Sequence, residues 1–557
     1  MYLLKINYMS KLSSYADKRT ATINEHGKTA VTNFMGGNSY ELNPLDTLRI
    51  VAASSIFGEP QYYRAGLDGK TAKSGFANTV TFMDYSIFAD TFKDTKSADE
   101  MFVKAIDEAL DFDYGKTLKL AIELRTEYFM RLNPAVIFVR AAVHANRTAF
   151  NEANPGLMKE IGKKISLRPD DLTNQFEYFM YIKGSKKGLP SIVKRTWAER
   201  LQEFSRYQLN KYKGKRLIDL VRVSHANNED INELMTTGTL QVKDTEQTWE
   251  SLRSAGKTWS EIVDTIRIPH MALLRNLRGI FKEITDCGGK TEGRTLAIKI
   301  LNDLKSGVPN GKQFPFRYWS AYNAVKNADI DNKQLVLDAL EECIDLAVSN
   351  MPKISGKVAC LSDNSGSAWG TMNSEYGSIT IAEIANLSSL ITAQQADEGY
   401  VGVFGDKLSL QGVSKRNGLL TQLKETSERG KRQGGGTENG IWLFWDEAIQ
   451  KKVHYDTVFI YSDMQCGTGE LYGINYSEYK QFVHKKGGSY IDVLALVEKY
   501  RATVNSKVNV YTVQVAGYNN SVLPVNLYRG AILSGWTGRE CNFAHSLNKI
   551  WDDLEKR

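Results

Sequence analysis

Cysteine is scarce in this chain: five stand among 557 residues, and no two of them form a C-x-x-C pair. Thiols so few and so widely spaced exclude a disulfide framework, argue against a structural zinc site and favour a reducing compartment. The sequence also lacks any apolar run close to the ~18 residues of a membrane span. The apolar stretch at its start is too brief for a signal peptide. We therefore expect a cytoplasmic protein with no membrane partner.

Signatures of catalysis are missing as well. There is no H-E-x-x-H motif, and Ser365 lies in S-G-S without the G-x-S-x-G elbow of a hydrolase. In GKRQGGGT, Lys431 precedes the glycines instead of following them, so this stretch is not a phosphate-binding P-loop. We expect no catalytic residues and no enzymatic activity.

The charge of the chain is unevenly distributed. The formal net charge is +7, but the window 159–222 alone holds 16 basic and 7 acidic residues, an excess of nine. A local excess larger than the total for the chain indicates a surface for a polyanion. The alternative is that these lysines and arginines merely solvate the outer faces of helices.

The pattern of apolar residues changes near residue 350. A chain of 557 residues also exceeds what one hydrophobic core usually supports, so we expect more than one domain. From 45 to 350, segments such as RLIDLVRVS at 216–224 carry apolar residues at three- and four-residue spacing, which predicts a HEAT-like α-solenoid, with a compact helical bundle as the alternative. From 351, β-rich runs such as DTVFIYSD at 456–463 alternate with helical stretches, which predicts a doubly wound parallel sheet. We expect a helical domain at 1–350 and an α/β domain at 351–557.

A candidate metal site follows one of these predicted strands. VACLSDNSGSAWG at 358–370 places Asp363, Ser365 and Ser367 where a buried apolar run ends. One carboxylate and two hydroxyls suit a hard cation, Mg²⁺ or Mn²⁺, with coordination positions left for water or for an acidic group of a partner. The alternative is an ordinary polar turn after a strand.

Two residues further along the chain extend this pattern. Thr437 follows a glycine-rich loop, and Asp463 ends the run 456–463. Because the carboxyl ends of parallel strands meet at one edge of a sheet, these loops are expected to converge. The series D-x-S-x-S, Thr, Asp resembles the metal-ion-dependent adhesion site of von Willebrand factor A-type domains, at all five positions. A metal-dependent nuclease, in which Asp363 and Asp463 hold Mg²⁺ against a phosphate, is the enzymatic rival.

The remainder of the chain resembles the TROVE module of the Ro ribonucleoprotein family and its bacterial relatives. Four segments carry the resemblance in the family's order: GGNSYELNPLDTLRIVAASSIFGEPQYY at 36–63, LIDLVRVSHANN at 217–228, IPHMALLRNLRGIF at 268–281 and FPFRYWSAYNAV at 314–325. His270 departs from the pattern, since the family more usually has a small or hydroxyl residue there.

This resemblance implies an RNA-binding scaffold whose helices close into a ring. It implies small noncoding Y-like RNA on a basic outer surface, single-stranded ends of misfolded RNA as a second ligand, and an exoribonuclease tethered through RNA in quality control or processing. We expect a monomer. A cation-dependent protein-interaction module without an RNA function is the alternative.

Basic side chains of the window 159–222 can neutralise phosphates, and seven aromatic residues interleave with them as possible stacking surfaces for unpaired bases. His225 matches the histidine of the family's S-H position, whose place on the RNA surface the resemblance implies. The predicted RNA-binding residues are Lys183, Lys186, Lys187, Arg195, Arg200, Arg206, Lys211, Lys213 and His225.

Overall fold

A computed structural model gives the architecture of the chain. The structure describes residues 22–23, 29–32, 38–40, 44–53, 98–127, 130–241, 247–286, 290–311, 313–374, 377–435, 440–462, 483–484, 490–491, 493–515, 523, 528–534 and 540–556.

The larger part is an array of helices in which successive elements pack side by side, as the sequence predicts. Near its middle, α4 packs on α3 and α7, and α7 packs on α10; further along, α14 packs on α15 and α16. The helices of the array are α2 (Pro44–Ala53), α3 (Ala98–Thr126), α4 (Leu132–Val143), α5 (Arg147–Ala153), α6 (Leu157–Ile165), α7 (Pro169–Lys183), α8 (Ser191–Glu203), α9 (Arg206–Lys211), α10 (Lys215–Ser224), α11 (Glu229–Thr237), α12 (Trp249–Ser254), α13 (Trp259–Thr265), α14 (His270–Asp286), α15 (Lys290–Gly311), α16 (Pro315–Lys326) and α17 (Lys333–Ser349).

Helical periodicity explains how each member of this array buries one face. In α10 the buried residues Leu217, Leu220, Val221 and Ser224 recur three and four positions apart, while Arg222 on the opposite side is exposed. Residues at this spacing lie above one another on a helix, so a single stripe faces the neighbouring helices. Each helix needs neighbours on its apolar stripe, which is why the elements stack into an extended array.

The second part is a six-stranded sheet with the order β13-β12-β9-β4-β7-β8. Its strands are β4 (Ile354–Asp363), β7 (Ala396–Phe404), β8 (Leu408–Gly412), β9 (Thr457–Ser462), β12 (Asn509–Gln514) and β13 (Gly530–Ser534). Neighbouring strands are parallel except for β8, which pairs with β7 in the antiparallel sense. The chain moves outward from β4 in one direction to β7 and in the other to β9, so the topological switch point lies between β4 and β9.

Alternate side chains of the central strands point to opposite faces of the sheet and pack into two separate hydrophobic cores. In β4, Val358 and Cys360 belong to the core that continues into the helical array, whereas Ala359 and Leu361 belong to a second core on the opposite face. The first face is covered by α18 (Ile381–Gln395) and α23 (Glu540–Lys556), and the second by α20 (Gly440–Gln450) and α22 (Val493–Thr503). Helix α19 (Leu419–Gly430) packs beside α18. Burial on both faces accounts for strands that are apolar throughout.

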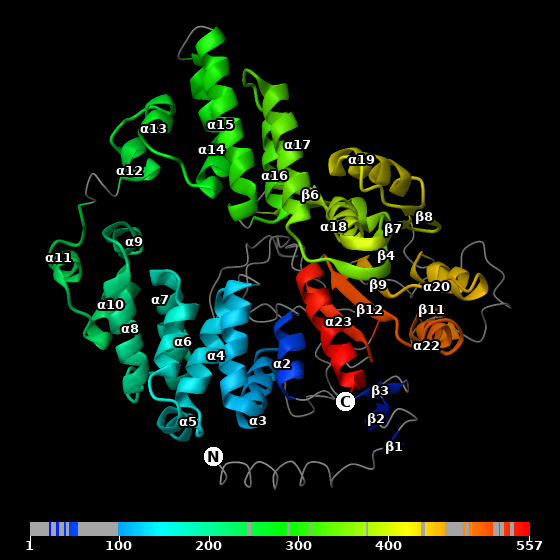
Figure 1. Ribbon diagram of the computed structural model, residues 1–557, viewed down its shortest axis with the longest axis horizontal. Helices are drawn as coiled ribbons and strands as arrows, with labels where there is room; N and C mark the ends of the chain where they lie inside the picture. The colour runs from blue at the N-terminus through cyan, green and yellow to red at the C-terminus, as the bar shows by residue number, and fades with distance from the viewer. Residues whose placement is uncertain are drawn as a thin grey trace.

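The α/β part joins both ends of the helical array, so that the elements form a closed ring (Figure 1). At one end α17 packs against α18 and α19, and at the other α2 packs against β13 and α23. Leu48 and Ala52 of α2 are fully buried, and α2 also packs on α3. The predicted ring is therefore present, but it is the α/β part that completes it.

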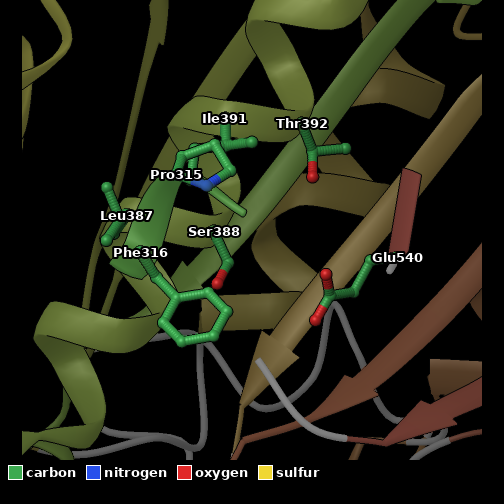
Figure 2. A pocket seen from close by; sticks show the side chains of 7 residues that line it. All are labelled: Pro315, Phe316, Leu387, Ser388, Ile391, Thr392 and Glu540. Atoms are coloured by element: carbon green, nitrogen blue, oxygen red, sulfur yellow. The ribbon is translucent and has the colours of Figure 1, made fainter. Parts of the chain in front are cut away.

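A small cavity lies at the first junction, between α16, α18 and the start of α23 (Figure 2). Its volume is about 10 Å³, which is room for one water molecule. The lining residues are Pro315, Phe316, Leu387, Ser388, Ile391, Thr392 and Glu540. A space of this size marks close packing between the two parts and is too small for a larger ligand.

Several short strands do not appear in the sequence analysis. They are an antiparallel three-stranded sheet of β1 (Thr22–Ile23), β2 (Thr29–Thr32) and β3 (Asn38–Tyr40), the hairpin of β5 (Thr371–Ser374) and β6 (Gly377–Thr380), the pair β10 (Val483–His484) and β11 (Tyr490–Ile491), and the edge strand β8. These runs of two to five residues are too short to show a period of two against their polar surroundings.

Candidate metal site and nucleic-acid interface

The carboxylate of Asp363 stands at the last residue of β4, fully buried at the switch point of the sheet. Its Oδ1 atom accepts the backbone N–H of Ser365 at 2.9 Å, which shapes the turn that follows the strand. Its Oδ2 atom accepts the hydroxyl of Ser462 at 2.6 Å. Because Ser462 is the last residue of β9, this bond ties together the two strand ends that flank the switch point.

Hydrogen bonds between asparagine side chains stabilise the turn after β4. The Nδ2 atom of Asn364 donates to the carbonyl oxygen of Ser362 at 3.0 Å and to Oδ1 of Asn386 at 2.9 Å, and Nδ2 of Asn386 donates back to Oδ1 of Asn364 at 3.0 Å. All three residues are buried. A buried polar network with paired members is rigid, so the turn is fixed independently of any ligand.

The glycine-rich loop lies against this turn. The backbone N–H of Gly366 donates to the carbonyl oxygen of Gly435 at 2.8 Å, and a Cβ atom at Gly366 would lie 3.2 Å from that same oxygen. Gly434 has a φ of +96°, a conformation that L side chains rarely adopt. The ammonium group of Lys431 lies 4.8 Å from the ring centroid of Trp369, which follows the same turn. Glycine therefore permits the close approach of the two loops.

The five predicted metal ligands are described to different extents. Asp363 and Ser365 are both fully buried and stand two positions apart. Ser367 begins the short 3-10 helix η4 (Ser367–Trp369), although its side chain lies outside the described residues. Thr437 and Asp463 also lie outside them. Their described neighbours Gly435 and Ser462 both bond to the turn after β4.

A buried carboxylate beside hydroxyl groups, at the ends of adjacent parallel strands, is a donor set that fits Mg²⁺ or Mn²⁺. Across the described ranges, three or more His, Cys, Asp or Glu side chains nowhere gather into a metal-binding cluster. Ser462 and Asn386 are the supporting residues that the sequence analysis missed; Ser462 directly precedes Asp463, so its place at the same strand end could have been anticipated.

Four of the predicted RNA-binding residues are already engaged with carboxylates. Lys186 pairs with Asp219 at 3.3 Å, Arg200 with Glu203 at 2.9 Å and Lys211 with Glu250 at 3.0 Å. Arg206 bonds to Glu233 at 2.7 Å and also to Asp230, and these bonds raise its pKa above the usual value. Its guanidinium joins α9 to α11, so it is a structural contact between helices as well as a positive charge.

The other predicted residues are Lys183, Lys187, Arg195, Lys213 and His225, and all five are exposed. Lys213 donates to the hydroxyl of Thr239 at 3.0 Å. His225 ends α10 with a φ of +58°, a left-handed C-cap conformation. Lys183, Lys187 and Arg195 form no ion pair with any carboxylate in the part of the chain that the structure describes. They are the side chains most available to phosphates.

Most of the aromatic residues between these cations belong to the core. Phe176, Tyr178, Phe179 and Trp197 are at most 1 % exposed, whereas Tyr181 on the same helix as Tyr178 is 59 % exposed. Tyr207 and Tyr212 are partly exposed. Tyr181 lies two residues from Lys183, so an accessible ring accompanies the accessible charges. An exposed aromatic ring beside cations is the arrangement on which unpaired bases stack.

No helix within the described residues is both long enough and apolar enough to cross a bilayer.

Comparisons with a family model, with curated proteins and with solved structures each find similarity to this chain. Residues 240–364 match the model of the TROVE domain family. A segment of 83 residues is 34 % identical to telomerase protein component 1 of Mus musculus, which is 14 % of this chain and only 3 % of that protein's length. The crystal structure of the Ro (RSR) protein of Deinococcus radiodurans superposes with a TM-score of 0.61 and 15 % identity, over 91 % of this chain and 100 % of that one. The TROVE resemblance is confirmed over residues 240–364, and the structural match confirms the predicted fold class.

Proposed function

We propose that this chain, which carries the TROVE-family segment 240–364 on the fold of a Ro protein, is an RNA-binding scaffold without catalytic activity. The observation that carries the proposal is the exposure of the cations Lys183, Lys187 and Arg195 and of the ring of Tyr181. Cations without local carboxylate partners release counterions from RNA when they bind phosphates, which is the main source of affinity for nucleic acid.

The ligands proposed for this surface are those that the family resemblance implies. A small structured noncoding RNA, Y-like in kind, binds the outer basic surface through its phosphates. Single-stranded ends of misfolded RNA bind in competition with it. An exoribonuclease is recruited through the RNA and not through a direct protein contact. The chain acts as a monomer in the cytoplasm.

The α/β part supplies a second, separate function in this proposal. Asp363, Ser365, Ser367, Thr437 and Asp463 hold one Mg²⁺ or Mn²⁺ ion at the switch point of the sheet. The metal ion supplies a positive charge with free coordination positions, which accept an acidic group of a partner protein. The buried carboxylate of Asp363 also supports the alternative function, a cation-dependent interaction module without RNA.

Sequencing of the RNA that co-purifies with the full chain, crosslinked before lysis, tests the RNA function. Enrichment of one abundant structured small RNA over a mock purification is the expected result. If no RNA is enriched, the TROVE resemblance describes the fold alone, and the cation-dependent interaction module becomes the leading function.

Replacement of Asp363 by Ala tests the division of labour. We expect D363A to lose Mn²⁺ binding in a calorimetric titration while its affinity for the recovered RNA stays within about twofold of wild type, since Asp363 ends β4 of the sheet whereas the proposed RNA-binding residues belong to the helical array. The control is D329A, which removes an exposed carboxylate of the helical array and leaves both ligands unaffected. A folded D363A variant with a large loss of RNA affinity would contradict the separation of the two sites.

A further inference from the structure

Helix α14 carries a stripe of three cations that the predicted RNA surface does not include. Arg275, Arg278 and Lys282 are exposed and lie three and four residues apart, so they share one face of the helix. The opposite face buries Leu277 and Ile280 among other apolar residues. At a rise of about 1.5 Å per residue, the three positions span roughly 10 Å along the helix.

Ion pairs with the described carboxylates do not occupy these three cations. None of the three forms an ion pair with a carboxylate within the described ranges. Glu283 of the same helix is bound elsewhere: its carboxylate accepts hydrogen bonds from Arg253 at 2.9 Å and from the backbone N–H of Trp259 at 2.5 Å. Glu283 therefore fastens α12 and α13 to α14 and leaves the cations to solvent.

The stripe adjoins the end of the basic window that was identified from the sequence. Glu250 of α12 accepts bonds from Lys211 and from the hydroxyl of Tyr207, both on α9, and it is also within electrostatic range of Arg275. Helices α9, α12 and α14 thus meet around one carboxylate. Trp249, next to Glu250, is partly exposed and stacks on Trp259 with 5.6 Å between ring centroids.

We propose that the cationic face of α14 is a second RNA-contact surface, which takes the phosphates of a single-stranded segment. The inference rests on the proposed RNA function and adds a site to it. A stripe one helix wide can follow one backbone, whereas a duplex presents two. The partly exposed indole of Trp249 offers a stacking surface, which suits unpaired bases. Unlike Lys186 or Lys211, these cations need not release a protein carboxylate before they bind a phosphate.

The test compares the full chain with the variant R275A/R278A/K282A in fluorescence anisotropy titrations against a short labelled oligouridylate. Salt is varied between about 50 and 200 mM. Each phosphate contact on a single strand contributes about 0.7 to the slope of log K against log salt, so three lost contacts should reduce its magnitude by about two. Affinity for a structured stem-loop RNA should change much less, because Lys183, Lys187 and Arg195 remain.

A matched control removes the same charge elsewhere in the array. Arg294, Lys299 and Lys326 are exposed cations on α15 and α16, and their triple Ala variant should keep the wild-type slope for oligouridylate. A charge-conserving variant, R275K/R278K, should also keep most of the binding, provided that circular dichroism shows all variants to be folded.

Each outcome decides between the claims. If the wild type binds both RNAs and the α14 variant keeps its slope, or if the control loses as much as the variant, the α14 surface is refuted while the RNA function stands. If the α14 variant loses binding to polyglutamate and retains oligouridylate, the face serves an acidic protein instead. If the wild type binds neither RNA, the proposed function itself has failed.

Discussion

The exposed cations Lys183, Lys187 and Arg195 give the most quantitative prediction. Replacing all three with Ala removes three charges that have no carboxylate partner among the described residues. Each phosphate neutralised on a duplex contributes about 0.9 to the slope of log K against log salt, and about 0.7 on a single strand. The triple variant should therefore bind structured RNA with a slope smaller in magnitude by about two to three. Filter-binding titrations at several salt concentrations measure this quantity directly.

The control for this experiment removes a complete ion pair. Lys299 of α15 and Asp264 of α13 lie 3.3 Å apart outside the predicted RNA-binding residues, and replacing both with Ala leaves the net charge unchanged. An exposed pair of this kind contributes little to stability, about 0–1 kcal/mol, so K299A/D264A should fold and should keep the wild-type salt slope. An unchanged slope in the triple variant, or an equal loss in the ion-pair variant, would place the RNA surface elsewhere.

Three further predictions concern the framework that positions these sites. Asp171→Ala breaks the buried bond to Arg125, which is 2.8 Å long, and should lower the free energy of unfolding by about 3–5 kcal/mol, whereas Asp171→Asn should cost clearly less in the same urea titrations. Gly430→Ala would put a Cβ atom 2.0 Å from Oδ1 of Asn364, and Asn364 directly follows Asp363 in the sequence. The substitution should therefore disturb the metal site, so that calorimetry shows Mn²⁺ binding at least about tenfold weaker while RNA affinity stays unchanged. Burial lowers the pKa of His270 below 6.5, so the unfolded chain binds a proton at this histidine before the folded chain does as pH falls. The stability that His270 contributes is therefore present above about pH 6.5 and lost below it. Between about pH 7.5 and 5 the melting temperature of H270Q should fall less than that of wild type, and equal falls would refute the assignment.

The helical array shows what periodicity can and cannot predict. The buried stripe of α10 follows directly from apolar residues at three- and four-residue spacing. In α3, Asp113 has a non-helical backbone, with a φ of −154° and a ψ of 93°, and divides the 29-residue element into two helical segments. Helical periodicity does not show that α2 reaches the α/β part, because contacts between residues some 500 positions apart depend on the curvature of the whole array.

The two sites differ in how many of their contacts join residues that are close together in the sequence. Asp363 and Ser365 are predictable because they stand two positions apart in one short pattern that directly follows an apolar run. The bond from Ser462 to Asp363 joins residues 99 positions apart and depends on the register of β4 and β9. Sequence alone could count the charges of the basic window but not their pairing, since the carboxylates that bind Arg206 come 24 and 27 residues later.

The most direct test of the account is mass spectrometry of peptides crosslinked by ultraviolet light to the RNA that co-purifies with the full chain. The account predicts crosslinked peptides from the helical array, concentrated within 159–225 and 268–286, and few from 351–557. Crosslinks concentrated in the α/β part would contradict the assignment of RNA to the helices and of the metal ion to the sheet.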